Sequence, residues 1–313
     1  MSKKKIMKIG QVLLLVLISV GLLSGCNFQL FLENVNRQLS TQNTTQETSS
    51  YNGTGEYQAR DYEFVGSADD LQGKVLVVTI FLNDSSSYWT YEEENAVKDR
   101  IEIAGNFIED SASYYGKTVD VISDEGNNAD LSYEFEYSGT VSDFDTLDEN
   151  ALDPYQESLL DAISSGIPSE QLIQKYNAGS IAYVGVVNKN GRSYAYPYDE
   201  DYGADYYNEC CCLFFTDETY GDEEPPAVYA HEIMHLFGAE DLYEGTDATY
   251  NELSSGQYDY IVNNYPNEIM YTTYDENGYS VQGRVSNEVS DITAYYLGWI
   301  DTLPTGFLDA AAY

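Results

Sequence analysis

The stretch His231-Glu232-Ile233-Met234-His235-Leu236-Phe237-Gly238-Ala239-Glu240-Asp241 decides how the centre of this chain folds and what it can bind. The chain has two histidines, and both lie here, four residues apart. Positions i and i+4 share one face of a helix, so the two imidazoles can converge on one ion. Gly238 can leave the helix in a left-handed turn, and the backbone can then fold back to present Asp241 as a third ligand. The stretch therefore predicts a metal-binding helix that ends in a tight turn.

A glutamate follows the first histidine and completes the His-Glu-x-x-His pattern of zinc peptidases. Catalytic zinc takes three protein ligands and keeps one position for water, so His231, His235 and Asp241 would be the ligands. Glu232 shares their helical face without being a ligand, and it would act as the general base toward the zinc-activated water. These residues predict a zinc-dependent endopeptidase.

The motif as a whole resembles the zinc signature of the metzincin peptidases, in the variant that replaces the third histidine by aspartate. Pro266-Asn267-Glu268-Ile269-Met270-Tyr271 resembles the Met-turn that lies beneath the zinc site in that clan, with Met270 as its methionine. Leu297-Gly298-Trp299 and Leu242-Tyr243 resemble segments of immune inhibitor A-like secreted bacterial peptidases. The resemblance is confined to residues 231–300, and upstream of it only the order of elements is similar.

The resemblance implies an α+β, metzincin-like fold with a mixed five-stranded sheet, an active-site helix and a smaller C-terminal subdomain. The peptidase domain would comprise residues 66–313, divided into an upper part at 66–241 and a lower part at 242–313. Residues 193–198 would form the antiparallel edge strand along which an extended substrate lies. Apolar runs and helical periodicity predict the other elements. The strands are expected at residues 74–82, 118–122, 181–187 and 211–216, and the helices at 92–115, 155–164 and 169–176. Asn188-Lys189-Asn190-Gly191 predicts a hairpin turn that leads from residues 181–187 into 193–197.

Two features of the site have competing interpretations. Glu288 is a rival third ligand, because Asn287-Glu288-Val289-Ser290-Asp291 resembles the second motif of thermolysin-type enzymes, and Glu240 is a lesser candidate. Metzincins that stabilise the oxyanion with a tyrosine place it two residues after the methionine, where this chain has Thr272. Tyr271 or Tyr274 could take that role instead.

The first residues predict export and lipid anchoring. Four lysines precede a short apolar run at residues 12–23, as in a signal peptide. Leu23-Ser24-Gly25-Cys26 resembles the lipobox of bacterial lipoproteins, so residues 1–25 would be removed and Cys26 would carry lipid. Residues 26–65 are rich in Ser, Thr, Gln and Asn and would form a flexible tether that holds the domain at the outer face of the cell membrane. The alternatives are cleavage at another position and an uncleaved anchor.

The charge of the chain limits its partners. The formal net charge is −39, and loss of residues 1–25 would leave 10 basic and 53 acidic residues, a net charge of −43. Such a charge excludes nucleic acid and anionic lipid as partners, and it leaves a protein or peptide substrate. The acidic segment 199–209 is a candidate Ca²⁺ site beside the Zn²⁺ site, because calcium takes six to eight oxygen ligands.

Three of the four cysteines are consecutive, at Cys210, Cys211 and Cys212. Neighbouring cysteines rarely pair with one another, and Leu213-Phe214-Phe215 follows them, so they are interpreted as small apolar residues of a buried strand. A thiolate metal site is the alternative.

The alternative to a peptidase is a catalytically inactive surface lipoprotein of metallopeptidase-like fold that binds a ligand or adhesin partner. The 31 tyrosines suit a recognition surface. The presence of Glu232 favours the enzyme, because a binding protein needs no base beside its metal. The sequence leaves the substrate, the cleavage specificity and the oligomeric state open.

Overall fold

The computed structural model describes residues 67–68, 71–125, 128–142, 153–197, 209–243 and 253–311. Chain contacts separate Met1–Glu56 from Tyr57–Tyr313, and every described residue belongs to the second unit. Cys26, the expected tether and residues 199–208 of the candidate calcium segment lie outside the described residues. Among the helices that the structure describes, none is both long and apolar enough to cross a membrane.

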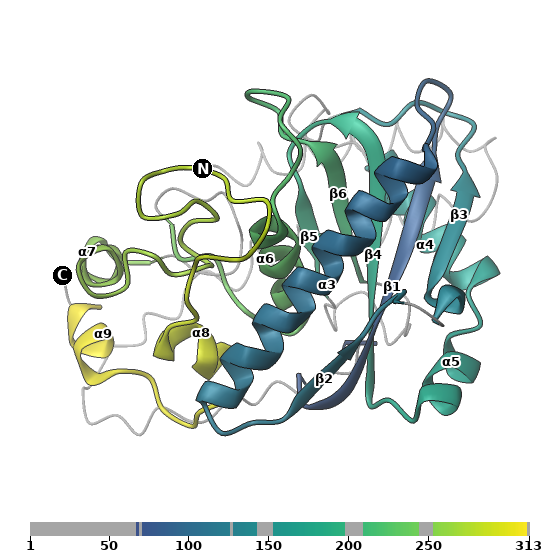
Figure 1. The fold of residues 1–313 in the computed structure, drawn as a ribbon. Helices are drawn as coiled ribbons and strands as arrows, with labels where there is room; N and C mark the ends of the chain where they lie inside the picture. Colours follow the sequence, from purple (N-terminus) through teal and green to yellow (C-terminus); the bar gives the residue numbers. More distant parts are fainter. Residues whose placement is uncertain are drawn as a thin grey trace, which may run out of the picture. The chain divides into compact units, whose positions relative to one another are not determined.

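The described unit is built on one mixed sheet in the order β2-β1-β4-β6-β5, with β3 also paired to β1 (Figure 1). Every strand pair is parallel except β5 with β6. The strands are β1 (Gly73–Asn83), β2 (Val119–Ile122), β3 (Ser132–Glu136), β4 (Ser180–Asn190), β5 (Tyr194–Tyr196) and β6 (Cys210–Thr216).

The prediction of a five-stranded sheet is wrong, because the sheet contains a sixth strand, β3. β1 is 11 residues long and can pair with two short strands along one edge. Gly73 to Leu76 pair with β2, and Thr79 to Asn83 pair with β3. β3 lies in a segment for which we predicted no strand, and Tyr133 and Phe135 alternate there with polar residues.

The predicted hairpin between residues 181–187 and 193–197 is also wrong, because β6 lies between β4 and β5. β6 is buried from Cys210 to Phe215, so both its edges and both its faces need cover. β4 covers one edge in parallel, and the three-residue β5 covers the other in antiparallel. β5 is therefore the antiparallel edge strand that we expected over residues 193–198, although it is shorter.

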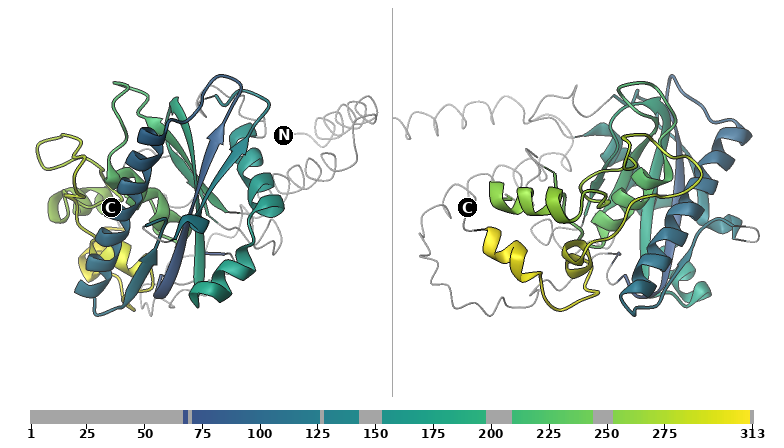
Figure 2. Two further views of the ribbon diagram at one scale, coloured as in Figure 1. Left: turned by 45° about the vertical axis from the view of Figure 1, so that its right-hand side comes forward. Right: turned by 60° about the vertical axis from the view of Figure 1, so that its left-hand side comes forward.

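Helices cover both faces of the sheet (Figure 2). The alternation of side chains along β1 divides the interior into two cores. Val75, Val77 and Phe81 belong to the first core, whereas Leu76 and Val78 belong to the second. The first core includes residues of α3 (Tyr91–Tyr114) and α6 (Pro226–Leu236), and the second includes residues of α4 (Pro154–Gly166) and α5 (Ser169–Tyr176).

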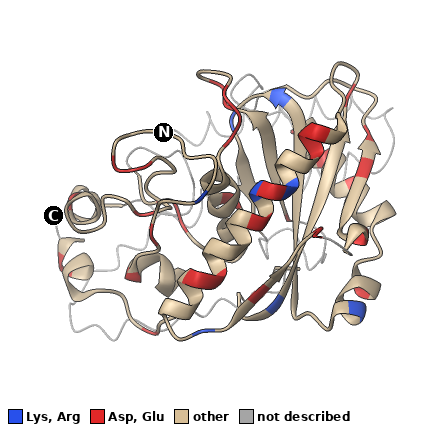
Figure 3. Cartoon of the chain, viewed as in Figure 1, with Lys and Arg blue, Asp and Glu red and all other residues tan. Residues whose placement is uncertain are grey.

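The longest of the described helices, α3, begins at a capping box in which Thr90 and Glu93 satisfy each other's backbone amides. Val97, Ile101 and Ile108 form the face that is buried against the sheet. The ribbon of α3 contains more acidic residues than basic ones (Figure 3).

The C-terminal segment contributes residues to the first core. It contains α7 (Ser255–Asn264), α8 (Asp291–Tyr296) and α9 (Thr305–Ala310). Trp299 is buried, and its indole Nε1 donates to the carbonyl oxygen of Leu71, just before β1, over 3.0 Å. Met270 and Phe307 are buried in the same core as Met234 of α6. Residues of the C-terminal segment therefore share one core with the helix that carries both histidines.

Candidate metal centre

The helix that carries the two histidines, α6, begins and ends where the sequence indicates. Pro225 is its N-cap and Pro226 its first residue, where the missing N–H costs no hydrogen bond. At the other end Gly238 has a φ of +89°. The Gly238 amide donates to the His235 carbonyl over 2.9 Å, and the Ala239 amide donates to the Met234 carbonyl over 3.0 Å. These two bonds form a Schellman motif, which reverses the chain and returns Asp241 toward the helix.

His231, His235 and Asp241 form a group that could hold a metal ion. Their three ligand atoms make a nearly equilateral triangle. The Nε2 atoms of the histidines are 3.1 Å apart, and each is 3.2 Å from Oδ1 of Asp241. Zinc ligands at about 2.0 Å in a tetrahedral arrangement lie about 3.3 Å from one another. The spacing of the three atoms therefore suits zinc.

The hydrogen bonds of the histidines set which nitrogen faces the centre of this triangle. Nδ1 of His231 donates to the Ile269 carbonyl oxygen over 3.0 Å, and Nδ1 of His235 donates to the Ala239 carbonyl oxygen over 2.8 Å. Because carbonyl oxygens only accept, each neutral imidazole presents a bare Nε2 to the centre. Oδ1 of Asp241 is buried there without a hydrogen-bond donor. Three acceptors that face one another call for a cation, so the donor set fits a divalent metal.

The ionisation of the group follows from the same arrangement. Burial disfavours the charged form of His231, but the nearby Asp241 carboxylate outweighs burial and raises the pKa of His231 to about 9. Burial opposes ionisation of Asp241 as well, yet the two histidines hold the pKa of its carboxyl group well below its usual range. The site is therefore built to contain positive charge between the three side chains.

Glu232 is buried beside this group, on the same helix. Burial raises the pKa of its carboxyl group, and the two histidines partly offset this increase. The carboxylate is within electrostatic reach of both histidines and of Asp241 but is not part of the ligand triangle. Glu232 therefore lies beside the group without being one of its possible ligands.

The segment expected to form the Met-turn lies directly beneath the histidines. Met270 is fully buried, and its carbonyl oxygen accepts from the amide of Leu242 over 2.9 Å. The preceding carbonyl, that of Ile269, is the one that accepts from His231. Glu268, which the sequence offered only as part of this turn, is a fully buried carboxylate with several donors.

The rival ligands lie elsewhere. The side chain of Glu288 is exposed, while its backbone pairs with the turn through the Ile269 amide. Neither Glu288 nor Glu240 belongs to the group of possible ligands found among the described residues. The structure thus brings together His231, His235 and Asp241 and leaves Glu288 outside.

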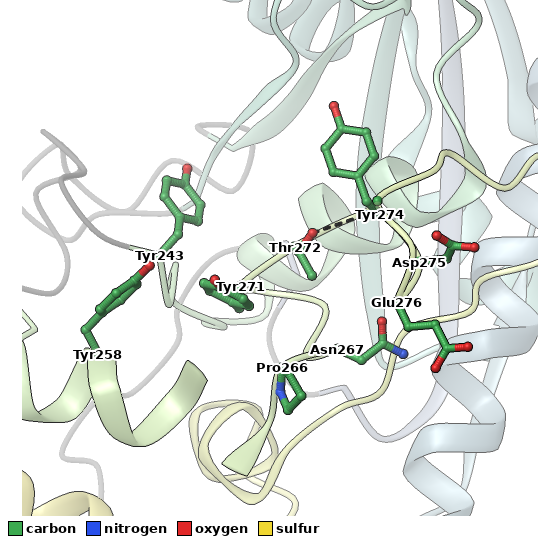
Figure 4. Close-up of a pocket in the computed structure, with 10 residues that line it drawn as sticks. Tyr243, Tyr258, Pro266, Asn267, Tyr271, Thr272, Tyr274, Asp275 and Glu276 are labelled. Carbon is green, nitrogen blue, oxygen red and sulfur yellow. Dashed lines mark hydrogen bonds between the residues drawn. The ribbon is translucent and has the colours of Figure 1, made fainter. Parts of the chain in front are cut away.

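Several tyrosines line a cavity of about 750 Å³ (Figure 4). Tyr243 lines it and donates its hydroxyl hydrogen to Oδ2 of Asp241 over 3.0 Å. Tyr258 of α7 and Tyr271 pack edge to face with ring centroids 6.1 Å apart. Tyr274 also lines the cavity, and its side chain is exposed. Of these tyrosines, Tyr243 has the direct bond to a ligand of the group, a role that sequence reasoning did not assign to it.

The three cysteines of β6 are fully buried free thiols. Cys210 and Cys212 face the second core with their Sγ atoms 3.9 Å apart, and Cys211 faces the first core. None of them is part of the possible metal group among the described residues. Their surroundings are those of small apolar core residues.

The chain matches no protein-family model. No curated protein matches its sequence. Among solved structures it is similar to metalloproteinase-II from Bacteroides fragilis, with a TM-score of 0.36 and 14% sequence identity. The similarity covers 80% of this chain and 59% of that protein, so this chain spans about three fifths of its length. A similarity at this level establishes neither a family nor an activity for this chain.

Proposed function

We propose that this protein is a zinc-dependent endopeptidase. The observation that carries the proposal is the triangle of two bare imidazole nitrogens and one carboxylate oxygen with sides of 3.1, 3.2 and 3.2 Å, with Glu232 buried beside it. Three ligands and a separate carboxylate are the requirement of metal-assisted hydrolysis.

His231, His235 and Asp241 would hold the metal. A bound zinc ion would supply Lewis acidity, which lowers the pKa of water to about 7 and polarises a carbonyl oxygen. Glu232 would accept a proton from the attacking water at its carboxylate and return this proton to the leaving nitrogen. Burial keeps this carboxylate out of bulk solvent, where its proton transfer would compete with bulk water.

The surroundings of the site favour a polypeptide substrate. β5 lies at one edge of the sheet that the structure describes and pairs with β6 in antiparallel. An extended peptide would add to this edge by backbone hydrogen bonds. The tyrosine-lined cavity of about 750 Å³ beside Asp241 is large enough for a bulky side chain.

The proposals on family, export and lipid anchoring rest on the sequence. The motif at residues 231–241 and the turn around Met270 favour a metzincin-like peptidase that resembles the immune inhibitor A-like enzymes. The basic residues, the apolar run and the lipobox favour an exported protein with lipid on Cys26 at the outer face of the cell membrane. Replacement of Cys26 by serine would then abolish incorporation of radiolabelled palmitate and release the protein from the membrane fraction.

The test of the function compares the full chain with Glu232→Ala on an unstructured protein such as casein, with the zinc content of both determined. We expect one zinc ion per chain in both, and cleavage that falls by about 100-fold to 10,000-fold in the variant, the range for loss of a general base. Glu288→Ala is the control, because its exposed side chain lies outside the ligand group. Zinc in both proteins without cleavage by either would favour the binding lipoprotein instead.

A further inference from the structure

Glu268 is a buried carboxylate that binds two parts of the chain at once. Its Oε2 accepts from the amide of Met270 over 2.5 Å and from the amide of Tyr271 over 3.1 Å. Its Oε1 accepts from the hydroxyl of Thr293 over 2.5 Å and from the amide of Ser290 over 3.3 Å. The side chain is fully buried. It therefore ties the turn beneath the histidines to the first turn of α8.

The contact with Met270 leads directly to the metal group. The N–H of Met270 and the carbonyl of Ile269 belong to one peptide unit, which is planar and rigid. Glu268 accepts from the N–H of this unit over 2.5 Å, and His231 donates through Nδ1 to its carbonyl over 3.0 Å. The Glu268 carboxylate, the Ile269–Met270 peptide and the His231 ring are thus joined by consecutive hydrogen bonds. These bonds end at Nδ1 of the ring whose Nε2 faces the centre of the group.

This series of hydrogen bonds affects how the ring of His231 is held. A negative charge on the N–H side of a peptide polarises the unit and makes its carbonyl oxygen a stronger acceptor. A stronger acceptor keeps the proton of His231 on Nδ1 and holds the ring in one plane, so that Nε2 stays free toward the centre. Histidine ligands commonly obtain this orientation from a carboxylate or a carbonyl in contact with the ring. Here the carboxylate would act through one intervening peptide.

Burial of Glu268 is unfavourable in itself. Burial raises the pKa of its carboxyl group, while the Thr293 hydroxyl and the Ser290 and Met270 amides lower it, and the result is about 7. An apolar residue of similar size would avoid this desolvation. The carboxylate provides hydrogen-bond acceptors for the amides of the turn, which an apolar residue could not provide.

We propose that Glu268 is a positioning residue of the metal centre, which orients His231 through the Ile269–Met270 peptide. This inference rests on the proposed function, since it assumes that His231 is a metal ligand. The residue that orients His231 would thus lie in the turn around Met270 and not in α6, the helix that carries both histidines.

The test measures zinc affinity by competition with a chromogenic chelator, in the full chain and in three variants. Glu268→Ala removes every acceptor and should weaken zinc binding by about 10-fold to 100-fold, the usual effect of losing an outer-layer partner. Glu268→Gln keeps one oxygen for the Met270 amide, and its NH₂ can donate to the Thr293 hydroxyl, so its affinity should stay within about threefold of the unsubstituted chain. Thr293→Val, which leaves Oε2 and the turn intact, covers the case in which the alanine variant does not fold and should weaken binding by about twofold to fivefold.

A matched control is available in Asp84, a second buried carboxylate that accepts from backbone amides, those of Ser86, Ser87 and Val141. Asp84→Asn should lower the melting temperature without any change in zinc affinity. A general loss of stability would instead weaken zinc binding in the Asp84 and Glu268 variants alike, and that result would overturn the proposal.

A spectroscopic measurement isolates the effect on His231. Because the chain has two histidines, ¹⁵N-histidine labelling of the zinc-loaded protein yields two ring N–H resonances. Glu268→Gln replaces the carboxylate by a neutral amide. In this variant the Nδ1–H resonance of His231 should move upfield, and its proton should exchange faster with solvent. The resonance of His235, whose Nδ1 donates to Ala239, should stay in place. Unchanged spectra together with unchanged affinities would overturn the positioning role and leave the peptidase intact, whereas absence of zinc from the unsubstituted chain would overturn both.

Discussion

Tyr243 donates its phenolic hydrogen to Oδ2 of Asp241 over 3.0 Å, and the other oxygen of that carboxylate faces Nε2 of both histidines at 3.2 Å. One oxygen is thus held by a hydroxyl, and the other is left for the centre of the site. The orientation of the Asp241 carboxylate therefore depends on a residue that also lines the neighbouring cavity.

Loss of this hydroxyl should loosen Asp241. Tyr243→Phe keeps the ring and removes one hydrogen bond to a charged group, which contributes about 1.5–3 kcal/mol. Asp241 is still present in this variant, so only part of this energy should be lost from zinc binding. We expect the zinc affinity in the chelator competition to be about 3-fold to 30-fold weaker. Tyr271→Phe, a change in the same cavity, should leave the affinity unaltered. Equal affinities of both variants and the unsubstituted chain would show that Tyr243 does not orient the ligand.

The choice between Asp241 and Glu288 can be decided directly. Asp241→Ala removes one corner of the triangle and leaves two neutral imidazoles, so zinc affinity should fall by at least 100-fold. Glu288→Ala should bind zinc as the unsubstituted chain does, because its exposed side chain lies outside the group. Equilibrium dialysis with zinc provides the measurement. The opposite order of the two variants would favour a thermolysin-like ligand set.

Glu224 should make the stability of the protein depend on pH. Burial raises the pKa of its carboxyl group, Asp217 and Glu232 raise it further and Arg100 lowers it, with a result of about 8 against 4.5 for the unperturbed group. The folded protein therefore keeps a proton that the unfolded chain releases over this interval. The free energy of unfolding should fall as the pH rises from about 4.5 to 8, by at most about 1.4 kcal/mol per pH unit from this group.

Glu224→Gln removes this dependence, so the variant should gain stability relative to the unsubstituted chain as the pH rises from 5 to 8. Urea unfolding at pH 5, 6.5 and 8 measures the difference. A difference that stays constant from pH 5 to pH 8 would contradict the raised pKa of Glu224.

The thiols of β6 should be inaccessible in the native state. Cys210, Cys211 and Cys212 are fully buried, and burial raises the pKa of the Cys211 and Cys212 thiols well above the usual range. In a full chain with Cys26→Ser, a thiol reagent such as dithionitrobenzoate should label no cysteine before unfolding and three afterwards. Metal content should be unchanged in Cys210→Ala and Cys212→Ala. A lower zinc content in either variant would support the thiolate site.

Much of the fold could be predicted because its signals are local. The apolar run in β1, the helical spacing of apolar residues in α3 and the glycine turn after α6 each depend on a few neighbouring residues. β3 was missed because its five residues pair with the far half of β1, and the alternation of Tyr133 and Phe135 was too short to stand out. The order of β4, β6 and β5 was missed because the sequence places β5 between the other two, whereas core packing places β6 there.

At the metal centre, too, local features could be predicted from the sequence and long-range contacts could not. The spacing of His231 and His235 and the glycine turn that returns Asp241 are set by helix geometry within 11 residues, so the sequence by itself determined which side chains can meet. The tertiary structure alone decided how they are held. The Ile269 carbonyl that orients His231 lies 38 residues further along the chain, and Glu268 joins that turn to Thr293, another 25 residues on. Contacts at such separations depend on the packing of the C-terminal segment against the first core, which no local pattern specifies.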